Sequence, residues 1–307
     1  MKQLVLLCSS DSSSDCPANC FPDRMKPKAS IIILDFFKSR RVCENVESIL
    51  KQKVDFPYEI IVVDNSANPE NAKKLDPIRK YPEVTVFINE TNLGYVKGNN
   101  RGVQRAKGDY IVIVNPDIIW KDEDSFQKMI DYMDAHPEIG VLGPKQINDN
   151  DGSVAMTVRA FPKISNQVFR RTKLRKLPFI SSLVAKDECK NLDYDKTQTV
   201  DWLQSSFWIT RHSLWNKIGG LNKAYFIFMS DPDYCFECWK EGYEVVYFPE
   251  TKVYADGKRA SAGGLKEFFS KKILRQHLKD SLKYRMSHLF KRNPRLKYLK
   301  NLENGLA

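Results

Sequence analysis

The chain has 307 residues, of which 42% are hydrophobic, and its formal net charge is +11. This length corresponds to one large or two small domains, and the composition excludes a disordered chain, a collagen and a disulfide-stapled miniprotein. No apolar run approaches the roughly 18 residues that a membrane-spanning helix needs, and the apolar start at residues 4–7 is too short for a secretory signal. We therefore expect a cytoplasmic protein.

The positive charge is concentrated near the end of the chain. Residues 258–300 contain 14 lysines and arginines against 2 acidic residues, whereas the rest of the chain is close to neutral. Such a segment is typical of proteins that bind a polyanion, either nucleic acid or an anionic membrane surface. The alternative is a solvated face without a partner.

Two of the seven cysteines, Cys235 and Cys238, have the spacing of a metal-binding pair. No second close pair of cysteines or histidines accompanies them, and a structural zinc site needs four ligands. Reduced thiols are therefore the expectation, with a zinc site as the alternative.

In chain order, residues 1–29 are rich in serine, aspartate, cysteine and proline, which predicts a loose extension. Apolar runs with a β-strand composition follow, and polar helical stretches separate them. The predicted strands are residues 30–34, 58–63, 84–88 and 110–114. Strands that alternate with helices predict an α/β fold, in which helices cover both faces of a mostly parallel central sheet.

Polar residues follow each of these four predicted strands. Ligands of open α/β sheets bind outside the carboxyl ends of the strands, which is where these residues would meet. The absence of a G-x-G-x-x-G motif and of a Walker lysine motif disfavours a dinucleotide-binding or P-loop protein. The candidate residues are Asp35, Asp64-Asn65-Ser66, Asn92-Leu93-Gly94 and Asn115-Pro116-Asp117.

The pattern changes after Asp117. A helix is predicted over residues 122–136 and a strand over residues 139–144, whereas residues 148–200 are irregular. A later helix opens at Ser230-Asp231-Pro232-Asp233, which resembles a capping box with Asp231 as the N-cap. From residue 265 to residue 290, apolar residues recur at nearly helical spacing among lysines and arginines, which predicts a basic amphipathic helical region.

Taken in order, the polar motifs resemble those of the family 2 glycosyltransferases, which have the GT-A fold. The resemblance extends from about residue 30 to residue 288, and it is greatest to the bacterial rhamnosyltransferases that extend a lipid-linked O-antigen or cell-wall saccharide. The segments that carry it are Asp64-Asn65-Ser66, Asn92-Leu93-Gly94, Gly98-Asn99-Asn100, Asn115-Pro116-Asp117, Val200-Asp201-Trp202, Gly219-Gly220-Leu221, Ser230-Asp231-Pro232-Asp233 and Phe268-Phe269-Ser270-Lys271.

The resemblance implies a nucleotide-diphospho-sugar transferase fold with a catalytic domain over residues 30–264. Residues 30–147 would form its nucleotide-binding half, and residues 148–264 its acceptor-binding half. Residues 265–307 would then form basic amphipathic C-terminal helices.

The resemblance also implies which residues bind the donor and its metal ion. Asp117 would bind Mg²⁺ or Mn²⁺, because a divalent cation neutralises the phosphates of the leaving group. The other polar residue of this motif, Asn115, is an amide, so we expect weak metal affinity; the alternative is a turn that ends the strand. The implied donor-binding residues are Asp35, Asp64, Asn92, Gly94, Asn99, Asn100, Asn115 and Asp117.

On the acceptor side, Asp231 occupies the position of the family's catalytic base and would accept the proton of the attacking hydroxyl. The alternative is that Asp231 only caps the helix. Trp202 and Asp233 are the implied acceptor-binding residues.

The chain departs from the family pattern at three positions. Ser205, Ser230 and Ala255 stand where glycine, glutamate and histidine are common. The missing histidine would weaken metal binding unless Asp256 substitutes for it.

The resemblance implies an inverting glycosyltransferase that moves L-rhamnose from dTDP-L-rhamnose to a lipid-linked saccharide in bacterial surface polysaccharide synthesis. Its partners would be a dTDP- or UDP-sugar donor, the lipid-linked acceptor and an anionic membrane surface at the basic C-terminal region. It would be cytoplasmic and peripherally associated with the inner face of the cell membrane. Nucleic acid is not expected, because the strand-end carboxylates would repel phosphate. The alternatives are a family 2 transferase for another nucleotide sugar and a non-enzymatic basic binding or assembly protein.

Overall fold

The computed structural model describes residues 25–161, 177, 182, 188–189, 192–256 and 272–304. The expectations for most of the N-terminal extension and for the first residues of the basic segment, 257–271, lie outside this part of the chain.

The first half of the described chain alternates strands with helices, as the sequence predicts. Local signals set several boundaries: α2, for example, has Pro69 in its first turn, and the side chain of Asn68 accepts a hydrogen bond from the backbone N–H of Asn71. The elements are β1 (Ala29–Asp35), α1 (Ser39–Ile49), β2 (Tyr58–Asp64), α2 (Pro69–Lys73), the 3₁₀ helix η1 (Asp76–Ile78), β3 (Val84–Ile88), α3 (Gly94–Val103), β4 (Tyr110–Val114) and α4 (Ser125–Ala135).

The second half has short strands, the two long strands β5 and β10, and a set of late helices. The helix α7 ends at Ile218, and its C-cap, Gly219, adopts a left-handed conformation with φ of 87°. The elements are β5 (Ile139–Asn148), β6 (Val158–Arg159), β7 (Gln198–Thr199), β8 (Trp202–Leu203), β9 (Phe207–Arg211), α7 (His212–Ile218), α8 (Ser230–Lys240), β10 (Glu244–Ala255), α10 (Lys272–His288) and α11 (Pro294–Glu303).

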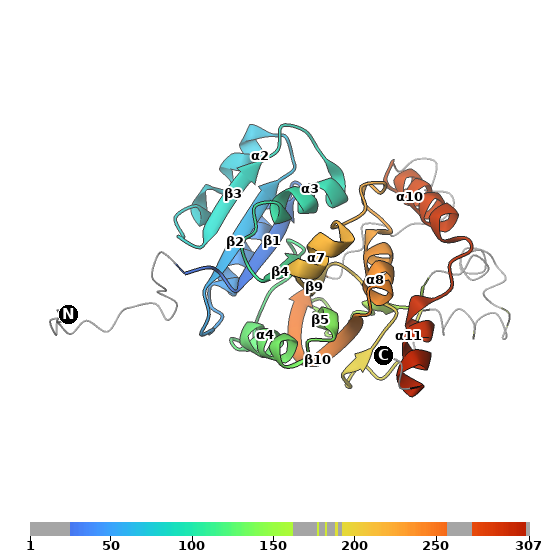
Figure 1. The fold of residues 1–307 in the computed structure, drawn as a ribbon. Coiled ribbons are helices and arrows are strands. Elements are labelled where there is room, and N and C mark those ends of the chain that lie inside the picture. Colours follow the sequence, from blue (N-terminus) through green and yellow to red (C-terminus); the bar gives the residue numbers. More distant parts are fainter. Residues whose placement is uncertain are drawn as a thin grey trace, which may run out of the picture.

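Within the described residues, eight strands form the main sheet in the order β3-β2-β1-β4-β9-β5-β10-β7 (Figure 1). The strands β1 to β4 are parallel to one another and β10 is parallel to β5, whereas β9 runs antiparallel between β4 and β5. The expected mostly parallel α/β sheet is confirmed. Because β1 and β2 pair in register up to Asp35 and Asp64, these carboxylates meet at one edge of the sheet.

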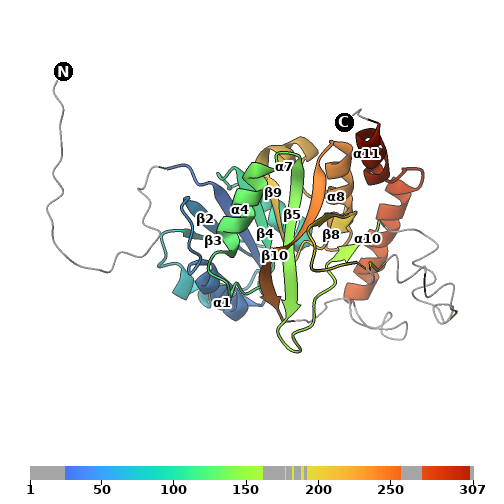
Figure 2. The same cartoon turned by 90° about the horizontal axis from the view of Figure 1, so that it is seen from below.

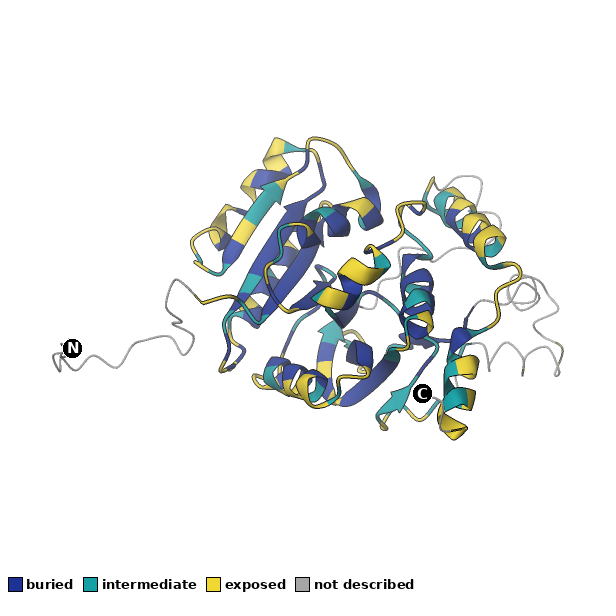
Figure 3. Ribbon diagram, viewed as in Figure 1, coloured by how far each residue is buried: buried dark blue, intermediate teal, exposed yellow. Residues whose placement is uncertain are grey.

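Helices cover both faces of the sheet, and each face has its own apolar core. On one face, apolar residues of α1 and α4 share a core with the odd-numbered residues of β1, such as Ile31 and Ile33. On the other face, apolar residues of α3, α7 and α8 share a core with Ile32 and Leu34. This alternation explains why the central strands β1 and β4 are buried along their whole length (Figure 3) and read as continuous apolar runs in the sequence.

The C-terminal helices α10 and α11 lie beside α8, at the end of the molecule away from β3 (Figure 2). The helix α10 buries Asp280, Ser281 and Tyr284, whereas Leu282 and Met286, two residues of its predicted apolar face, are 47% and 80% exposed. The helix is therefore docked on the domain through two polar residues and a tyrosine, whereas Leu282 and Met286 are exposed to solvent.

Candidate active site at the carboxyl ends of the strands

The carboxyl ends of β1 and β2 carry two buried carboxylates that one amide joins. The side chain of Asn71, in α2, donates to Asp35 Oδ2 at 2.8 Å and to Asp64 Oδ1 at 3.2 Å. Burial raises the pKa of Asp35, although the hydrogen bonds from Asn71 and from the backbone of Lys38 oppose the rise. Asp64 Oδ2 is buried and has no hydrogen-bond partner in the described part of the chain, so a donor from a ligand or a water would satisfy it.

Asn65, next to Asp64, clamps the loop that leads into α3. Its Nδ2 donates to Asn92 Oδ1 at 2.9 Å, and its Oδ1 accepts from the backbone of Leu93 at 2.9 Å. Asn92 Oδ1 also accepts from the backbone N–H of Gly94 at 2.8 Å. The predicted donor-binding residue Asn92 is thus part of the scaffold that shapes this loop.

Two glycines of the loop and helix are required for close packing within the protein. Gly94 has φ of 76°, and a Cβ atom there would lie 2.6 Å from the ring and backbone of Phe226. A Cβ atom at Gly98 would lie 2.6 Å from the side chain of Leu34. The structure therefore explains both glycines by the contacts of α3 with β1 and with the segment before α8.

The two asparagines of α3 also contact the protein backbone. Asn100 is buried; its Nδ2 donates to the carbonyl of Leu221 at 2.7 Å, and its Oδ1 accepts from the N–H of Leu221 at 3.0 Å. Asn99 Nδ2 donates to the carbonyl of Tyr95 at 2.9 Å. Asn100 therefore fixes the turn after α7, and a donor contact by either residue stays a prediction.

Asp117 and Asp256 form a carboxyl pair between the ends of β4 and β10. A bridge joins Ile119 to Tyr254, with N···O distances of 2.8 and 2.9 Å in the two directions, and it brings the segments together. The two carboxyl groups lie within hydrogen-bond reach of each other. Burial raises the pKa of Asp117; Asp256 adds to the rise, whereas Lys38, with its Nζ 3.6 Å from Asp117 Oδ1, opposes it.

This pair is the arrangement that could hold a divalent cation. The described residues contain no group of three or more His, Cys, Asp or Glu side chains suited to a metal ion. Oxygen ligands suit Mg²⁺ and Mn²⁺, which commonly bind one or two protein carboxylates and complete their shell with substrate phosphates and water. Asn115 is half-buried, and its backbone carbonyl accepts from Asn45 Nδ2 at 2.9 Å.

Asp231 lies in the first turn of α8 and has few partners. Its Oδ2 accepts a long hydrogen bond, 3.4 Å, from the backbone N–H of Ser205. Burial raises the pKa of Asp231 to about 6, although backbone N–H groups oppose the rise. A carboxylate with this pKa is suited to general-base catalysis near neutral pH.

Tyr95 is bonded to Ser205, the residue whose backbone N–H reaches Asp231. Its hydroxyl donates to the carbonyl of Ser205 at 2.7 Å and lies 3.0 Å from Ser205 Oγ. The carbonyl of the next residue, Ser206, accepts at 2.8 Å from the backbone N–H of Asn115, two residues before Asp117. Burial raises the pKa of Tyr95, and the charges of Asp231 and Asp117 both add to the rise. The segment Ser205-Ser206 therefore contacts both the predicted base and the strand end that leads to the predicted metal ligand.

The predicted capping box at the start of α8 is wrong. The helix begins at Ser230 and its N-cap is Met229, which has φ of 68° and makes no side-chain capping bond. Ser230 Oγ is buried without a hydrogen-bond partner among the described residues. Because the chain turns at the left-handed Met229, α8 starts earlier than predicted, at Ser230. Asp231 and Pro232 therefore both lie in its first turn.

Asp233, two residues further on, is held by side chains of the protein. Asn222 Nδ2 and the hydroxyl of Tyr225 each donate to its carboxylate at 3.1 Å, and His288 Nε2 lies 3.5 Å from Oδ1. Burial raises the pKa of Asp233 and lowers that of His288. The carboxylate faces α10, and a contact with an acceptor stays a prediction.

Trp202 is half-buried, and its Nε1 donates to the carbonyl of Ala160 at 2.8 Å. Its neighbour Asp201 accepts hydrogen bonds from the backbone of Phe161 at 2.9 Å and from Arg295 Nη1, in α11, at 3.2 Å. The motif around Trp202 is thus partly a docking point for the last helix.

Sequence reasoning missed Lys38, Asn71 and Tyr95, which no recognised motif contains. An amide or hydroxyl close after a strand end was the only signal that could have suggested Asn71 and Tyr95. The cysteines Cys235 and Cys238 belong to the buried side of α8, within the apolar core, and burial raises the pKa of each thiol.

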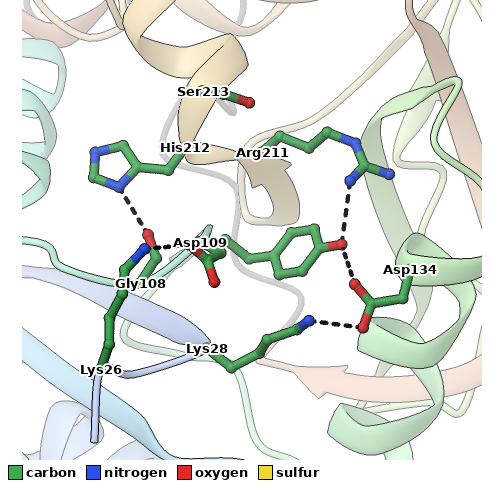
Figure 4. A pocket seen from close by; sticks show the side chains of 9 residues that line it. Lys26, Lys28, Gly108, Asp109, Asp134, Arg211, His212 and Ser213 are labelled. Atoms are coloured by element: carbon green, nitrogen blue, oxygen red, sulfur yellow. Dashed lines mark hydrogen bonds and ion pairs between the residues drawn. The ribbon is translucent and has the colours of Figure 1, made fainter.

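A separate pocket lies at the opposite, amino ends of β1 and β4 (Figure 4). Its cations are paired: Lys28 Nζ lies 2.9 Å from Asp134 Oδ2, and Lys26 forms an ion pair with Asp109. Arg211 Nη2 donates to backbone carbonyls, including that of Met133 at 2.6 Å. None of the candidate active-site residues lines this pocket.

Among the described helices, none is long and apolar enough to cross a membrane.

Comparisons with known proteins show the family and the fold of the chain. The family model described as glycosyl transferase family 2 matches residues 30–186. An N-acetylglucosaminyl-diphospho-decaprenol L-rhamnosyltransferase of Mycobacterium tuberculosis is 26% identical over 208 residues, which cover 64% of this chain and 66% of that protein, just under two thirds of its length. The rhamnosyltransferase WbbL of Escherichia coli is 27% identical over 249 residues, which cover 75% of this chain and 83% of that protein.

Solved structures share the fold. GalNAc-T7 with UDP, GalNAc and Mn²⁺ has a TM-score of 0.54 at 17% identity, and the match covers 80% of this chain and 48% of that one. The mannosyltransferase PcManGT from Pyrobaculum calidifontis, in complex with GDP-Man and Mn²⁺, has a TM-score of 0.52 at 12% identity and covers 95% of this chain and 84% of that one. These similarities confirm the expected GT-A fold.

Proposed function

The chain belongs to glycosyl transferase family 2 and is a glycosyltransferase, and we propose that it transfers L-rhamnose from a nucleoside diphosphate to a lipid-linked saccharide with inversion at the anomeric carbon. The sugar and the acceptor are suggested by the two rhamnosyltransferases to which the chain is similar. The observation that carries the proposal is that Asp231, a carboxylate with a pKa raised to about 6, accepts from the N–H of Ser205, while the carbonyl of the next residue, Ser206, accepts from the N–H of Asn115 at the strand end that leads to Asp117.

The carboxyl pair fits a divalent cation bound with the donor diphosphate. Two carboxylates within hydrogen-bond reach of each other repel unless a proton or a cation lies between them. Asp117 and Asp256 would hold Mg²⁺ or Mn²⁺ together with phosphate oxygens, and the ion would stabilise the charge of the departing diphosphate. Asp256 thereby takes the place of the histidine that is common in the family.

Asp35 and Asp64 would bind the nucleoside part of the donor. Both lie at the edge of the sheet, and Asp64 Oδ2 still needs a donor group. The imide N–H of thymine or uracil has the required chemistry, so the proposed donor is a dTDP- or UDP-sugar.

The proposed reaction is a single displacement. The acceptor hydroxyl oxygen attacks the anomeric carbon and forms the new glycosidic bond, while the bond from that carbon to the diphosphate oxygen breaks and its electron pair leaves with the diphosphate. The hydroxyl proton moves to the carboxylate of Asp231. Attack opposite to the leaving group inverts the anomeric configuration.

The outer face of α10 and α11 would hold the protein on an anionic membrane, at the inner face of the cell membrane. Large apolar side chains of these helices and of the turn between them are exposed, and lysines and arginines of the same segment, such as Lys279, Arg292 and Lys297, are exposed as well. Lysine and arginine near an anionic leaflet contribute about 1 kcal/mol each, and apolar side chains can enter the interface. The apolar residues of this face are Leu282, Met286, Leu289, Phe290, Leu296 and Leu302.

Binding and transfer assays test the proposal. Calorimetry with dTDP, UDP and GDP, with and without Mn²⁺, should give the highest affinity for dTDP with metal. Incubation with dTDP-L-rhamnose and a lipid-linked saccharide should give a product larger by one deoxyhexose. Transfer only from a different nucleotide sugar would show that this other sugar nucleotide is the donor. Nucleotide binding without any transfer would favour the alternative of a non-enzymatic assembly protein.

Vesicle sedimentation tests the membrane surface separately. A triple variant, Met286→Ser, Leu289→Ser and Phe290→Ser, should lose binding to vesicles that contain anionic lipid but keep its melting temperature. Ile88→Ser, which changes a 49% exposed isoleucine on β3, is the matched control and should bind like the wild type. Undiminished binding by the triple variant would contradict this assignment of the surface.

A further inference from the structure

The helix α10 carries a carboxylate that binds the backbone of the segment before α8. Asp280 is fully buried. Its Oδ2 accepts from the N–H groups of Ile227 at 3.1 Å, Phe228 at 3.0 Å and Phe226 at 3.3 Å. Its Oδ1 accepts from Gln276 Nε2 at 2.8 Å. A buried carboxylate is stable only when such donors surround it, so these bonds form as a set.

The segment 226–228 leads directly to the proposed base. The next residue, Met229, has φ of 68°, a left-handed conformation that is rare for a residue with a side chain, and Asp231 follows two positions later. Such a conformation persists only where its surroundings fix it. The three N–H groups bound by Asp280 belong to the three residues before Met229, so the carboxylate restrains the backbone at the point where the chain turns into α8.

The same segment also contacts the donor side of the site. The carbonyl of Phe226 accepts from the N–H of Val96, in α3, at 3.3 Å. The ring and carbonyl of Phe226 also occupy the space next to Gly94. A displacement of residues 226–228 would therefore disturb the start of α3 and the start of α8 together.

Other contacts of α10 support the same segment. Lys283 Nζ donates to the carbonyl of Ala224 at 2.7 Å, and the rings of His277 and Phe228 meet edge to face with centroids 4.5 Å apart. Each of these contacts is a single interaction at the side of the segment. Asp280 alone, among the described residues of α10, accepts from three consecutive backbone N–H groups of the segment.

We propose that Asp280 is a positioning residue for sugar transfer, whose carboxylate holds residues 226–228 and thereby aims Asp231 at the acceptor. This inference rests on the proposed function. It assigns to α10 a role in the rate of the reaction that is independent of its outward, apolar face. Misplacement of a catalytic group by about 1 Å can lower a rate by about 100-fold, so the effect should be measurable.

The test compares Asp280→Leu with Asp280→Asn in a detergent-solubilised transfer assay. Leucine has the branched shape of aspartate but is larger and accepts no hydrogen bond, so kcat should fall about 10- to 100-fold, and this fall should exceed any loss of affinity for dTDP with Mn²⁺. Asparagine can turn its carbonyl toward the three N–H groups and should recover most of kcat. The exposed Arg275→Gln, on the same helix, is the control and should match the wild type.

Hydrogen exchange provides a readout that does not depend on transfer. Amides of residues 226–229 should lose protection in Asp280→Leu and keep it in Asp280→Asn, whereas the strands β1 and β4 should be unchanged in both variants. Unchanged protection of 226–229, or unchanged kcat in Asp280→Leu, would overturn the inference. If Asp280→Leu loses protection throughout the protein, Asp280→Asn decides the question. A kcat in Asp280→Asn as low as that in Asp280→Leu, together with native protection at residues 226–229, would also overturn the inference. Failure of the wild type to transfer any sugar would refute the proposed function, and the exchange data would still decide whether Asp280 holds the segment.

Discussion

The two halves of the site are built in different ways. In the half formed by β1 to β4, amide side chains within that half shape the loops: Asn71 bridges Asp35 and Asp64, which lie 36 and 7 residues before it, and Asn65 holds the loop at Asn92, 27 residues after it. In the half that contains α8, contacts with distant parts of the chain position the carboxylates. Asp280 holds the segment before α8, and His288 faces Asp233.

The difference shows why acidic residues close together in sequence need not share a role. Asp231 and Asp233 lie in one helical turn, but Asp231 has a single long bond from the backbone of Ser205, whereas Asp233 has three side-chain neighbours. The carboxylate with fewer partners is the one that can exchange a proton with a ligand. The carboxylate with more partners joins α8 to α10.

The largest expected effect is on the rate of transfer in Asp231→Asn. Asparagine cannot accept the hydroxyl proton, so we expect the single-turnover rate to fall by about 10²–10⁴. Donor affinity should stay within a few-fold, because the fold and the carboxyl pair are unchanged. The matched variant Asp233→Asn should lose less than about tenfold in rate and more in melting temperature. The reverse order would make Asp233 the base.

The second effect is on metal-dependent donor binding in Asp256→Asn. Loss of one charged ligand should weaken the binding of dTDP with Mn²⁺ by at least about tenfold, the lower end of what even outer ligand partners cost. Calorimetry measures it, and Asp195→Asn, an exposed carboxylate 83% accessible and remote from the pair, is the control. Equal affinity in Asp256→Asn and in the wild type would show that Asp117 binds the metal without it.

A smaller effect separates scaffold from ligand contact in the first half. Asn100→Ala leaves the buried N–H and carbonyl of Leu221 without their partner, so we expect a loss of about 1–3 kcal/mol in the free energy of unfolding. Denaturant melts measure this loss. Nucleotide affinity should change less than twofold; a large drop in affinity at full stability would instead show that Asn100 contacts the donor.

The smallest effect is on the pH dependence of stability. The pKa of Asp231 is raised to about 6 in the folded protein, above about 3.9 in an unfolded chain, so the folded state binds the proton more tightly. Protonated Asp231 therefore stabilises the folded state below about pH 4, and this contribution to the free energy of unfolding is lost as the pH rises to about 6. The stability of the wild type relative to Asp231→Asn should therefore fall across this range by about 1 kcal/mol after solvent screening. A parallel pair of stability curves would contradict the raised pKa.

Much of the fold could be predicted from the sequence because apolar runs and the polar residues after them are local signals. The strands that end at Asp35 and Asp64 follow from such runs, and the family resemblance supplied the GT-A topology. The amide bridges of Asn71 and Asn100 could not be predicted, since each depends on which segment folds against it. The face through which α10 docks on the domain could not be predicted either. Its periodicity predicted an amphipathic helix, but Asp280 and Tyr284 are buried and Met286 is exposed.

The start of α8 shows the limit of local capping rules. Ser230, Pro232 and Asp233 match the pattern of a cap, but the backbone enters the helix through a left-handed Met229, and the residue before it, Phe228, is bound by Asp280, 52 residues further along the chain. A long-range contact therefore overrides the local preference.

The most direct test of Asp231 as the base is the pH dependence of the single-turnover transfer rate in the wild type and in Asp231→Asn, with saturating donor, Mn²⁺ and acceptor. The carboxylate must be ionised to accept the proton, so the wild-type rate should rise with pH and level off above about 6. The residual rate of Asp231→Asn should not change across the same range. An identical rise in the variant, or a wild-type rate that is independent of pH between 4.5 and 7 as an order-of-magnitude window around that pKa, would contradict the assignment.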